Sequence, residues 1–149
     1  MQGFEIQSTL LPFVQSHKDN VDLGPGIKER FDMAAGITPA EAEAARALRA
    51  KVAERLAGVA RPGSVIVLPT TPTLPPARGI PDGASFTEFR AKTLGYTCLA
   101  GHAGLPQISL PAAEAAGCPL GLSFIGWQGG DEALLDLAVR LEPLLSVPA

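Results

Sequence analysis

The chain has 149 residues, enough for one domain with a hydrophobic core, and its formal net charge is −3 without any run of Lys or Arg. This charge pattern excludes the basic face that nucleic-acid binding usually needs. No apolar run approaches the roughly 20 residues that span a bilayer, and no basic and apolar leader of the signal-peptide kind is visible. Two cysteines, Cys98 and Cys118, are too few for a disulfide framework. We therefore expect a cytoplasmic protein with free thiols and no membrane segment.

The composition is apolar for a small soluble protein. Hydrophobic residues make up 46% of the chain and the mean hydropathy is +0.21. Part of the apolar surface is therefore expected to face a partner or further chain. We divide the chain into a lead-in segment, residues 1–36, and an α/β portion, residues 37–149.

The first elements are predicted to be helical. Residues 1–26 form a weak helical stretch that ends in a Gly24-Pro25-Gly26 break, and residues 27–35 form a short helix that ends near Gly36. Thr38-Pro39-Ala40-Glu41 has the pattern of a capping box with proline at the first helical position. Apolar residues then recur at helical spacing, which predicts a helix over about 39–59.

The period changes at "SVIVLP", residues 64–69. This continuous β-branched run is apolar on both faces and predicts a central strand of a covered sheet. The prolines and glycines of "TTPTLPPARGIPDG", residues 70–83, predict a long and stiff loop. A loop at the carboxyl end of a strand is a common place for the wall of a binding site.

The last part of the chain alternates helices and strands. Ser85-Phe86-Thr87-Glu88 predicts a second capping box and a helix over about 86–101, and strands are predicted at 106–111 and 119–126. Asp131 is expected to cap a final helix, whose apolar stripe is Leu134, Leu135, Leu137, Ala138, Leu141 and Leu144. This order predicts the α/β class with a mixed sheet flanked by helices, in which three strands leave unpaired edges.

Two groups of side chains have residue types that catalysis uses. Ser123 lies in "GLSFIG", which resembles a nucleophile elbow, but the serine is inside an apolar strand rather than at a strand-to-helix turn. We interpret it as a buried strand serine. Cys98 and His102 share a helix face and could form half of a metal site. His17 and Cys118 are not placed to complete the four ligands of a structural zinc, so a buried thiol and a histidine near a helix end are favoured.

The remaining polar residues indicate no catalytic unit. No strand precedes Gly24-Pro25-Gly26, so it is interpreted as a turn and not as a dinucleotide fingerprint. The carboxylates Asp19, Asp22 and Glu29 lie in a polar, solvated stretch. The four lysines stand alone and are expected at the surface: Lys18, Lys28, Lys51 and Lys92. We expect neither a metal nor a cofactor.

A series of short motifs nevertheless resembles a known family. The motifs are Pro69-Thr70-Thr71-Pro72, Gly104-Leu105-Pro106, Pro119-Leu120-Gly121-Leu122 followed by Gly126, and Asp131 with Leu134 and Leu135. In this order and spacing they are similar to the C-terminal part of the amidase signature enzymes. The segment "SHKDNVDLGPGIKERF" is similar to what precedes these blocks in the same enzymes, so the resemblance covers essentially the whole chain.

The resemblance implies hydrolysis of a carboxamide C–N bond to an acid and ammonia or an amine. Enzymes of this family use a Ser, a cis-Ser and a Lys together with a Gly-rich Ser-Ser loop, and the 149 residues contain no such loop. The chain is then the C-terminal portion of an amidase, which contributes strands and substrate wall but is not catalytic by itself. The implied substrate-binding residues are Thr71 and Pro72 and, more loosely, Thr70 and Thr73. A rigid connector is the alternative role for this loop.

Departures from the family pattern bear on the substrate. Many members have Asn where this chain has Gly101, and amidotransferase subunits carry an acidic residue on the helix where this chain has Thr93, Leu94 and Gly95. This favours an amidase that acts on a small or aromatic carboxamide over a glutamine-using amidotransferase. The implied partner is a chain that carries the catalytic half, or a homo-oligomer.

Two alternative functions stay open at this point. One is a non-catalytic binding or scaffold domain that reuses the fold, and the other is a small metal-dependent hydrolase that uses Cys98 and His102.

Overall fold

The computed structural model describes residues 1–17, 23–77 and 84–145. Its contacts divide the chain into two compact units, Met1–Lys51 and Val52–Ala149. The expected division into a lead-in over 1–36 and an α/β portion over 37–149 stays a prediction. Among the described helices, none is long and apolar enough to cross a membrane.

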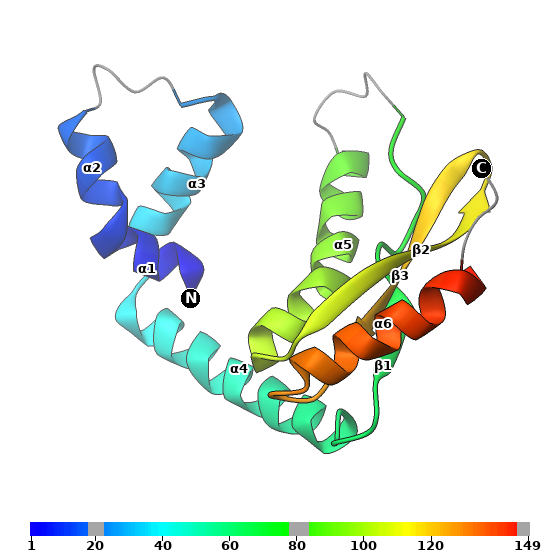
Figure 1. Ribbon diagram of the computed structural model, residues 1–149. Helices are drawn as coiled ribbons and strands as arrows, with labels where there is room; N and C mark the ends of the chain where they lie inside the picture. The colour runs from blue at the N-terminus through cyan, green and yellow to red at the C-terminus, as the bar shows by residue number, and fades with distance from the viewer. Residues whose placement is uncertain (18–22, 78–83, 146–149) are drawn as a thin grey trace. The chain divides into compact units, whose positions relative to one another are not determined.

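The first unit is helical (Figure 1). It holds α1 (Gln2–Thr9), α2 (Leu11–Ser16), α3 (Pro25–Ala35) and the first half of α4 (Pro39–Val59). α1 packs against α3, and the side-chain amide of Gln7 joins them by donating to the carbonyl oxygens of Ala34 and Ile37, each at 2.7 Å. Gly24-Pro25-Gly26 begins α3 rather than ending a helix, because proline is favoured in the first turn.

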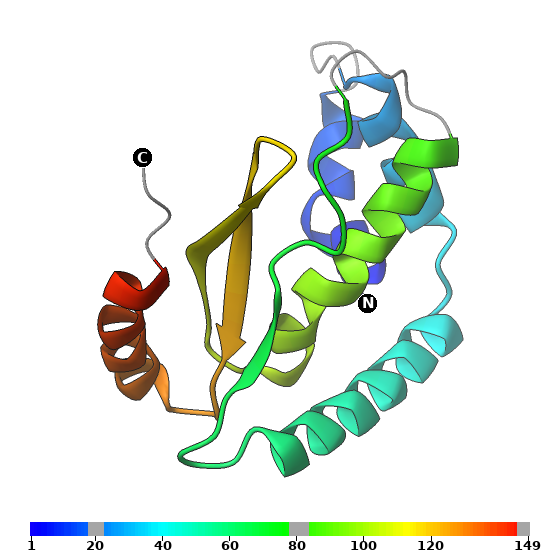
Figure 2. The ribbon, with the colours of Figure 1, turned by 90° about the vertical axis from the view of Figure 1, so that its right-hand side faces the viewer.

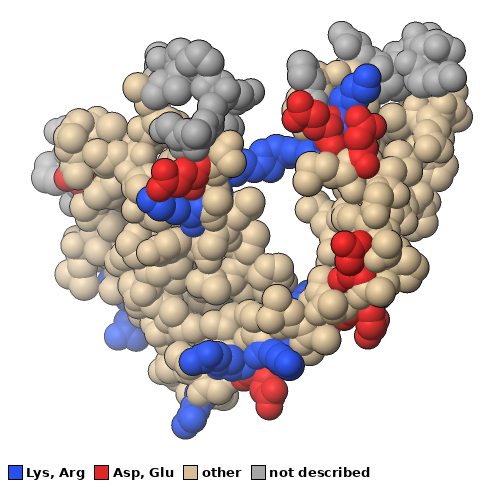
Figure 3. Space-filling view, turned by 180° about the vertical axis from the view of Figure 1, so that it is seen from behind, with Lys and Arg blue, Asp and Glu red and all other residues tan. Residues whose placement is uncertain are grey.

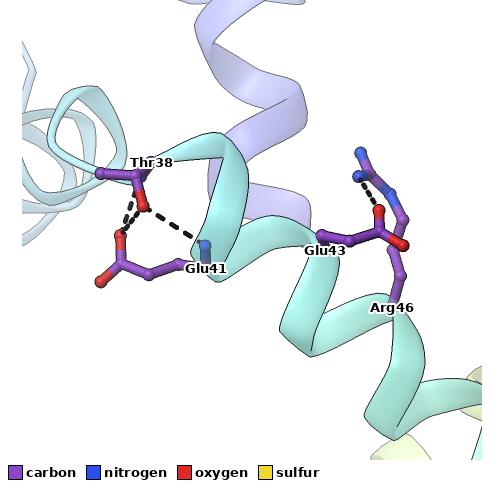
Figure 4. Close-up of polar contacts among 4 residues, drawn as sticks. All are labelled: Thr38, Glu41, Glu43 and Arg46. Carbon is purple, nitrogen blue, oxygen red and sulfur yellow. Dashed lines mark hydrogen bonds and ion pairs between the residues drawn. The ribbon is translucent and has the colours of Figure 1, made fainter.

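α4 begins and ends as predicted, with the capping box in place (Figure 4). The backbone N–H and the hydroxyl of Thr38 both donate to the Glu41 carboxylate at 2.8 Å, and the Glu41 N–H donates to the Thr38 hydroxyl at 3.3 Å. These hydrogen bonds hold the pKa of Glu41 below its ordinary value. Beyond the capping box, Glu43 and Arg46 form an exposed ion pair at 3.2 Å.

The second unit contains a three-stranded sheet in the order β1-β3-β2, formed by β1 (Ile66–Pro69), β2 (Gln107–Ala115) and β3 (Cys118–Ile125). Both pairings are antiparallel, so the described sheet is not mixed as expected. The physical reason lies partly in the turn after β2. Ala116 and Gly117 have φ angles of 51° and 72°, as in a type I′ turn, which folds β2 and β3 into a hairpin.

The strands also differ in extent and place from those predicted. β1 is two residues shorter than expected and lies at an edge, whereas β3 is central. β2 continues past Pro111, where it was expected to stop, because the register shifts between Pro111 and Ala113 and the chain resumes pairing beyond this irregularity.

Helices lie on both sides of the sheet, with α5 (Ala84–Ala103) on one face and α6 (Asp131–Leu145) on the other (Figure 2). This confirms the α/β class and the flanking helices. The core side chains of this unit include Phe124, Ile125, Leu134 and Ala138, and Ile125 is fully buried. Only part of the predicted stripe of α6 is buried, since Leu135 is 57% and Leu144 is 78% exposed.

α5 starts at Ala84, so Ser85 lies inside the helix and not before it as a cap. Its first turns are stabilised by an ion pair instead, in which Lys92 approaches the Glu88 carboxylate at 2.7 Å.

In the view of Figure 3, Lys and Arg side chains lie among Asp and Glu side chains, and no broad area of one sign forms on that face.

Candidate functional site

The central polar feature of the second unit is a chain of three hydroxyl groups that crosses all three strands. Ser123 in β3 is fully buried, and its Oγ lies 2.7 Å from Ser109 Oγ in β2 and 2.9 Å from Thr70 Oγ1, directly after β1. We call Thr70, Ser109 and Ser123 the hydroxyl chain. Every buried side-chain N and O atom among the described residues has a hydrogen-bond partner, Ser123 included.

Strand register explains why these hydroxyls meet. Ser109 and Ser123 are directly opposite one another in the β2–β3 ladder, and Leu68 is opposite Ser123 in the β1–β3 ladder. Side chains alternate between the two faces of a strand, so Thr70 lies on the same face as Leu68. The residues Ile108 and Leu110 line a groove with α6, so Ser109 points to the other face of β2.

Gly121 allows Thr70 to approach β3 closely. The Thr70 N–H donates to the Gly121 carbonyl at 2.9 Å. A Cβ atom at position 121 would lie 2.7 Å from Thr70 Oγ1, closer than such atoms approach in proteins. The glycine of the Pro119-Leu120-Gly121-Leu122 motif and the threonine of the Pro69-Thr70-Thr71-Pro72 motif therefore form one packed unit.

The loop after β1 begins at this anchored position. Thr71 and Thr73 are exposed and Pro72 is half-buried. The Thr71 hydroxyl donates to the Thr73 carbonyl at 3.1 Å, which tightens the loop locally. The structure thus brings Thr70 to the sheet and leaves the hydroxyls of Thr71 and Thr73 outside it. Their role as substrate-binding residues, with Pro72, stays a prediction.

A hollow of about 240 Å³ lies between this loop and the start of α5. Its lining combines apolar groups with a charged pair: Thr73, Leu74, Pro76, Glu88, Phe89 and Lys92. Lys92 holds the pKa of Glu88 below its ordinary value through a hydrogen bond and charge attraction, so this lining carries a carboxylate paired with an ammonium group. This lining is mixed and carries no net charge, because the Glu88 carboxylate and the Lys92 ammonium group offset one another.

The other predicted residues do not join this site as catalytic groups. Ser123 is a buried strand serine, as predicted, and its two partners are hydroxyls, neither of which can serve as a general base. Cys98 and Cys118 are free and half-buried, and His102 is exposed near the end of α5. Within the described ranges, no group of three or more His, Cys, Asp or Glu side chains could hold a metal ion. Asp19, Asp22 and Lys18 lie outside the described residues.

Sequence reasoning missed Ser109 and the closeness of Gly121 to Thr70. A signal for Ser109 was present in the sequence, because Ser109 and Ser123 are each flanked by apolar residues within a predicted strand. The sequence holds no comparable signal for the approach of Thr70 to Gly121, which depends on how β1 pairs with β3. The register that places Ser109 opposite Ser123 depends on the hairpin turn, which the sequence analysis did not identify.

The sequence matches a known protein family. The family model described as Amidase matches residues 9–135. The chain belongs to the amidase signature family. Amidase 1 of Oryza sativa subsp. japonica is 30% identical over 142 residues, which are 95% of this chain and 32% of that protein.

Solved amidase structures share the fold. A crystal structure of an amidase aligns with 89% of this chain and 31% of its own at a TM-score of 0.72 and 25% identity. The structure of a 6-aminohexanoate cyclic dimer hydrolase in complex with substrate aligns with 99% of this chain and 36% of its own, at a TM-score of 0.73 and 20% identity. The chain therefore spans about a third of the length of these three proteins.

Proposed function

We propose that this chain is the C-terminal portion of an amidase that hydrolyses a carboxamide C–N bond to an acid and ammonia or an amine. The observation that supports this most is the family match over residues 9–135 in a sequence that contains no Gly-rich Ser-Ser loop. Catalysis would then depend on a Ser, a cis-Ser and a Lys from a catalytic half, and this chain would contribute strands and the wall of the substrate pocket. We expect this assembly in the cytoplasm.

The loop after β1 would form that wall. Two observations support this role. Thr70 fixes the start of the loop to the sheet through its hydrogen bond with Ser123, and the side chains of Thr71 and Thr73 are exposed and free to contact a substrate. Thr71, Pro72 and Thr73 would contact the carboxamide substrate, and Thr70 would connect them to the sheet. The mixed, charge-neutral lining at the start of α5, which includes Leu74 and Phe89, supports an uncharged acyl group, in line with a small or aromatic carboxamide.

A chimera tests the proposed activity. In Oryza Amidase 1, the segment that this chain matches is replaced by this chain. We expect the chimera to release ammonia from a panel of carboxamides and the isolated chain to release none. Turnover by the isolated chain would contradict the proposal, as would an inactive chimera that folds with the parent's circular dichroism spectrum.

The wall residues are tested in the same chimera. Replacing Thr71 and Thr73 by Ala removes two exposed hydroxyls, so we expect KM to rise while kcat changes little. Thr9→Ala, at an exposed threonine of α1, is the matched control. Unchanged KM in the double variant would assign this loop the role of a rigid connector instead.

A further inference from the structure

A groove of about 490 Å³ with a mainly aliphatic lining lies between β2 and α6 in the second unit. β2 contributes Ile108, Leu110 and Pro111, and α6 contributes Leu135, Ala138 and Val139, with the Glu142 carboxylate one helical turn further along. Leu135 is 57% and Val139 is 70% exposed. Exposed large aliphatic side chains that gather along one groove are typical of a surface that binds another molecule or another part of a protein.

The same groove borders an unpaired edge of the described sheet. β2 pairs with β3 on one side only, so its outer edge presents backbone N–H and C=O groups to whatever lies beside it. An edge strand next to an apolar groove matches what an extended polypeptide needs, because the strand satisfies backbone hydrogen bonds and the groove accepts side chains. A small apolar ligand would leave the strand edge unsatisfied.

The comparisons indicate which polypeptide this is. The chain superposes on solved amidases with TM-scores of 0.72 and 0.73 but covers only 31% and 36% of them, so about two thirds of a similar fold lies outside the match. We propose that the groove between β2 and α6 is the docking surface for a second polypeptide that carries this remaining part of an amidase domain. This inference rests on the proposed function. It assigns Leu135 and Val139 of this chain to the surface that contacts the second polypeptide.

Co-expression tests the docking surface directly. The probe is Oryza Amidase 1 without the segment that this chain matches, expressed together with the tagged full chain of 149 residues. We expect the two polypeptides to be recovered together. Leu135→Glu places a charge in the groove and should reduce recovery about tenfold or more. Leu144→Glu is the matched control, since it lies on the same helix, is more exposed and does not line the groove; it should leave recovery within about twofold.

Two further controls keep the result interpretable. The Oryza protein's own matched segment, supplied as a separate chain, shows whether the split partner can reassemble at all and fixes the conditions used. Circular dichroism of both variants shows whether they fold. We expect both to fold, because the side chains of Leu135 and Leu144 are exposed.

Three outcomes would overturn the inference. Recovery of the Oryza control pair without recovery of this chain would exclude the partner. Equal recovery of the Leu135→Glu and Leu144→Glu variants would place the contact elsewhere. A dimer of this chain by light scattering, lost in Leu135→Glu, would assign the groove to a second copy. If the chimera is active and any of these outcomes is found, the docking surface is wrong but the proposed function is supported. If the chimera is inactive and recovery depends on the groove, the docking surface is supported but the proposed function is wrong.

Discussion

The unit Val52–Ala149 buries the large side chains of Phe124, Ile125 and Leu134, whereas the described residues of the unit Met1–Lys51 bury only alanines, Ala34 and Ala42. A buried alanine contributes far less transfer free energy than a buried isoleucine or phenylalanine. The first unit therefore depends more on hydrogen bonds, such as those of Gln7 and of the Thr38 cap. One short chain thus uses two different sources of stability, so substitutions are expected to cost different amounts of unfolding free energy in the two units.

The largest effect is expected in the second unit at Ile125. Ile125→Ala removes a fully buried side chain and leaves a cavity, so we expect a loss of about 3 kcal/mol in the free energy of unfolding, measured by urea denaturation. Val67→Ala is the control, because Val67 is 49% exposed. Similar losses for both variants would mean that this unit has no specific core.

A smaller effect is expected at the hydroxyl chain. Ser123→Ala leaves the hydroxyls of Thr70 and Ser109 without their shared partner, which should cost about 1–2 kcal/mol. Adding Thr70→Val should then cost less than it does alone, since the two residues belong to one network. Strictly additive losses in this double-mutant cycle would contradict a coupled chain of hydroxyls.

In the first unit, Gln7→Ala removes the hydrogen bonds that the Gln7 amide donates to the carbonyl oxygens of Ala34, Ala35 and Ile37. We expect a cost of about 1 kcal/mol, or roughly a fivefold faster amide hydrogen exchange in α1 and α3, with exchange in β3 unchanged. Gln2→Ala, at an exposed glutamine of the same helix, is the control. An equal change in β3 would show that the two units unfold together.

The smallest effect concerns pH. Because the pKa of Glu41 is lower in the folded chain than its ordinary value of 4.5, its cap stabilises α4 fully above that value. The contribution is lost as pH falls through the lowered folded pKa. NMR of the first turn of α4 during acid titration should show this loss, and Glu41→Gln should remove the pH dependence. A first turn that stays unchanged after Glu41 is fully protonated would argue against the cap.

Local signals in the sequence predicted a good part of this fold. Thr38 and Glu41 define the start of α4 within four residues, and the apolar spacing predicts its end near Val59, where the helix ends. The strand pairing could not be predicted in the same way, since it depends on Ala116, a non-glycine residue with a positive φ that no turn rule singles out. The hydroxyl chain depends on that pairing, because Thr70 and Ser123 are 53 positions apart in the sequence.

The burial of Ser123 has a consequence for chemical labelling. A fluorophosphonate reagent modifies serines that are both accessible and activated, and Ser123 is neither, with no exposed surface and only hydroxyl partners. In an assembly with a catalytic chain, covalent label should therefore appear on that chain alone. The mass of the labelled polypeptide would then report where the nucleophile resides, without any need for a known substrate.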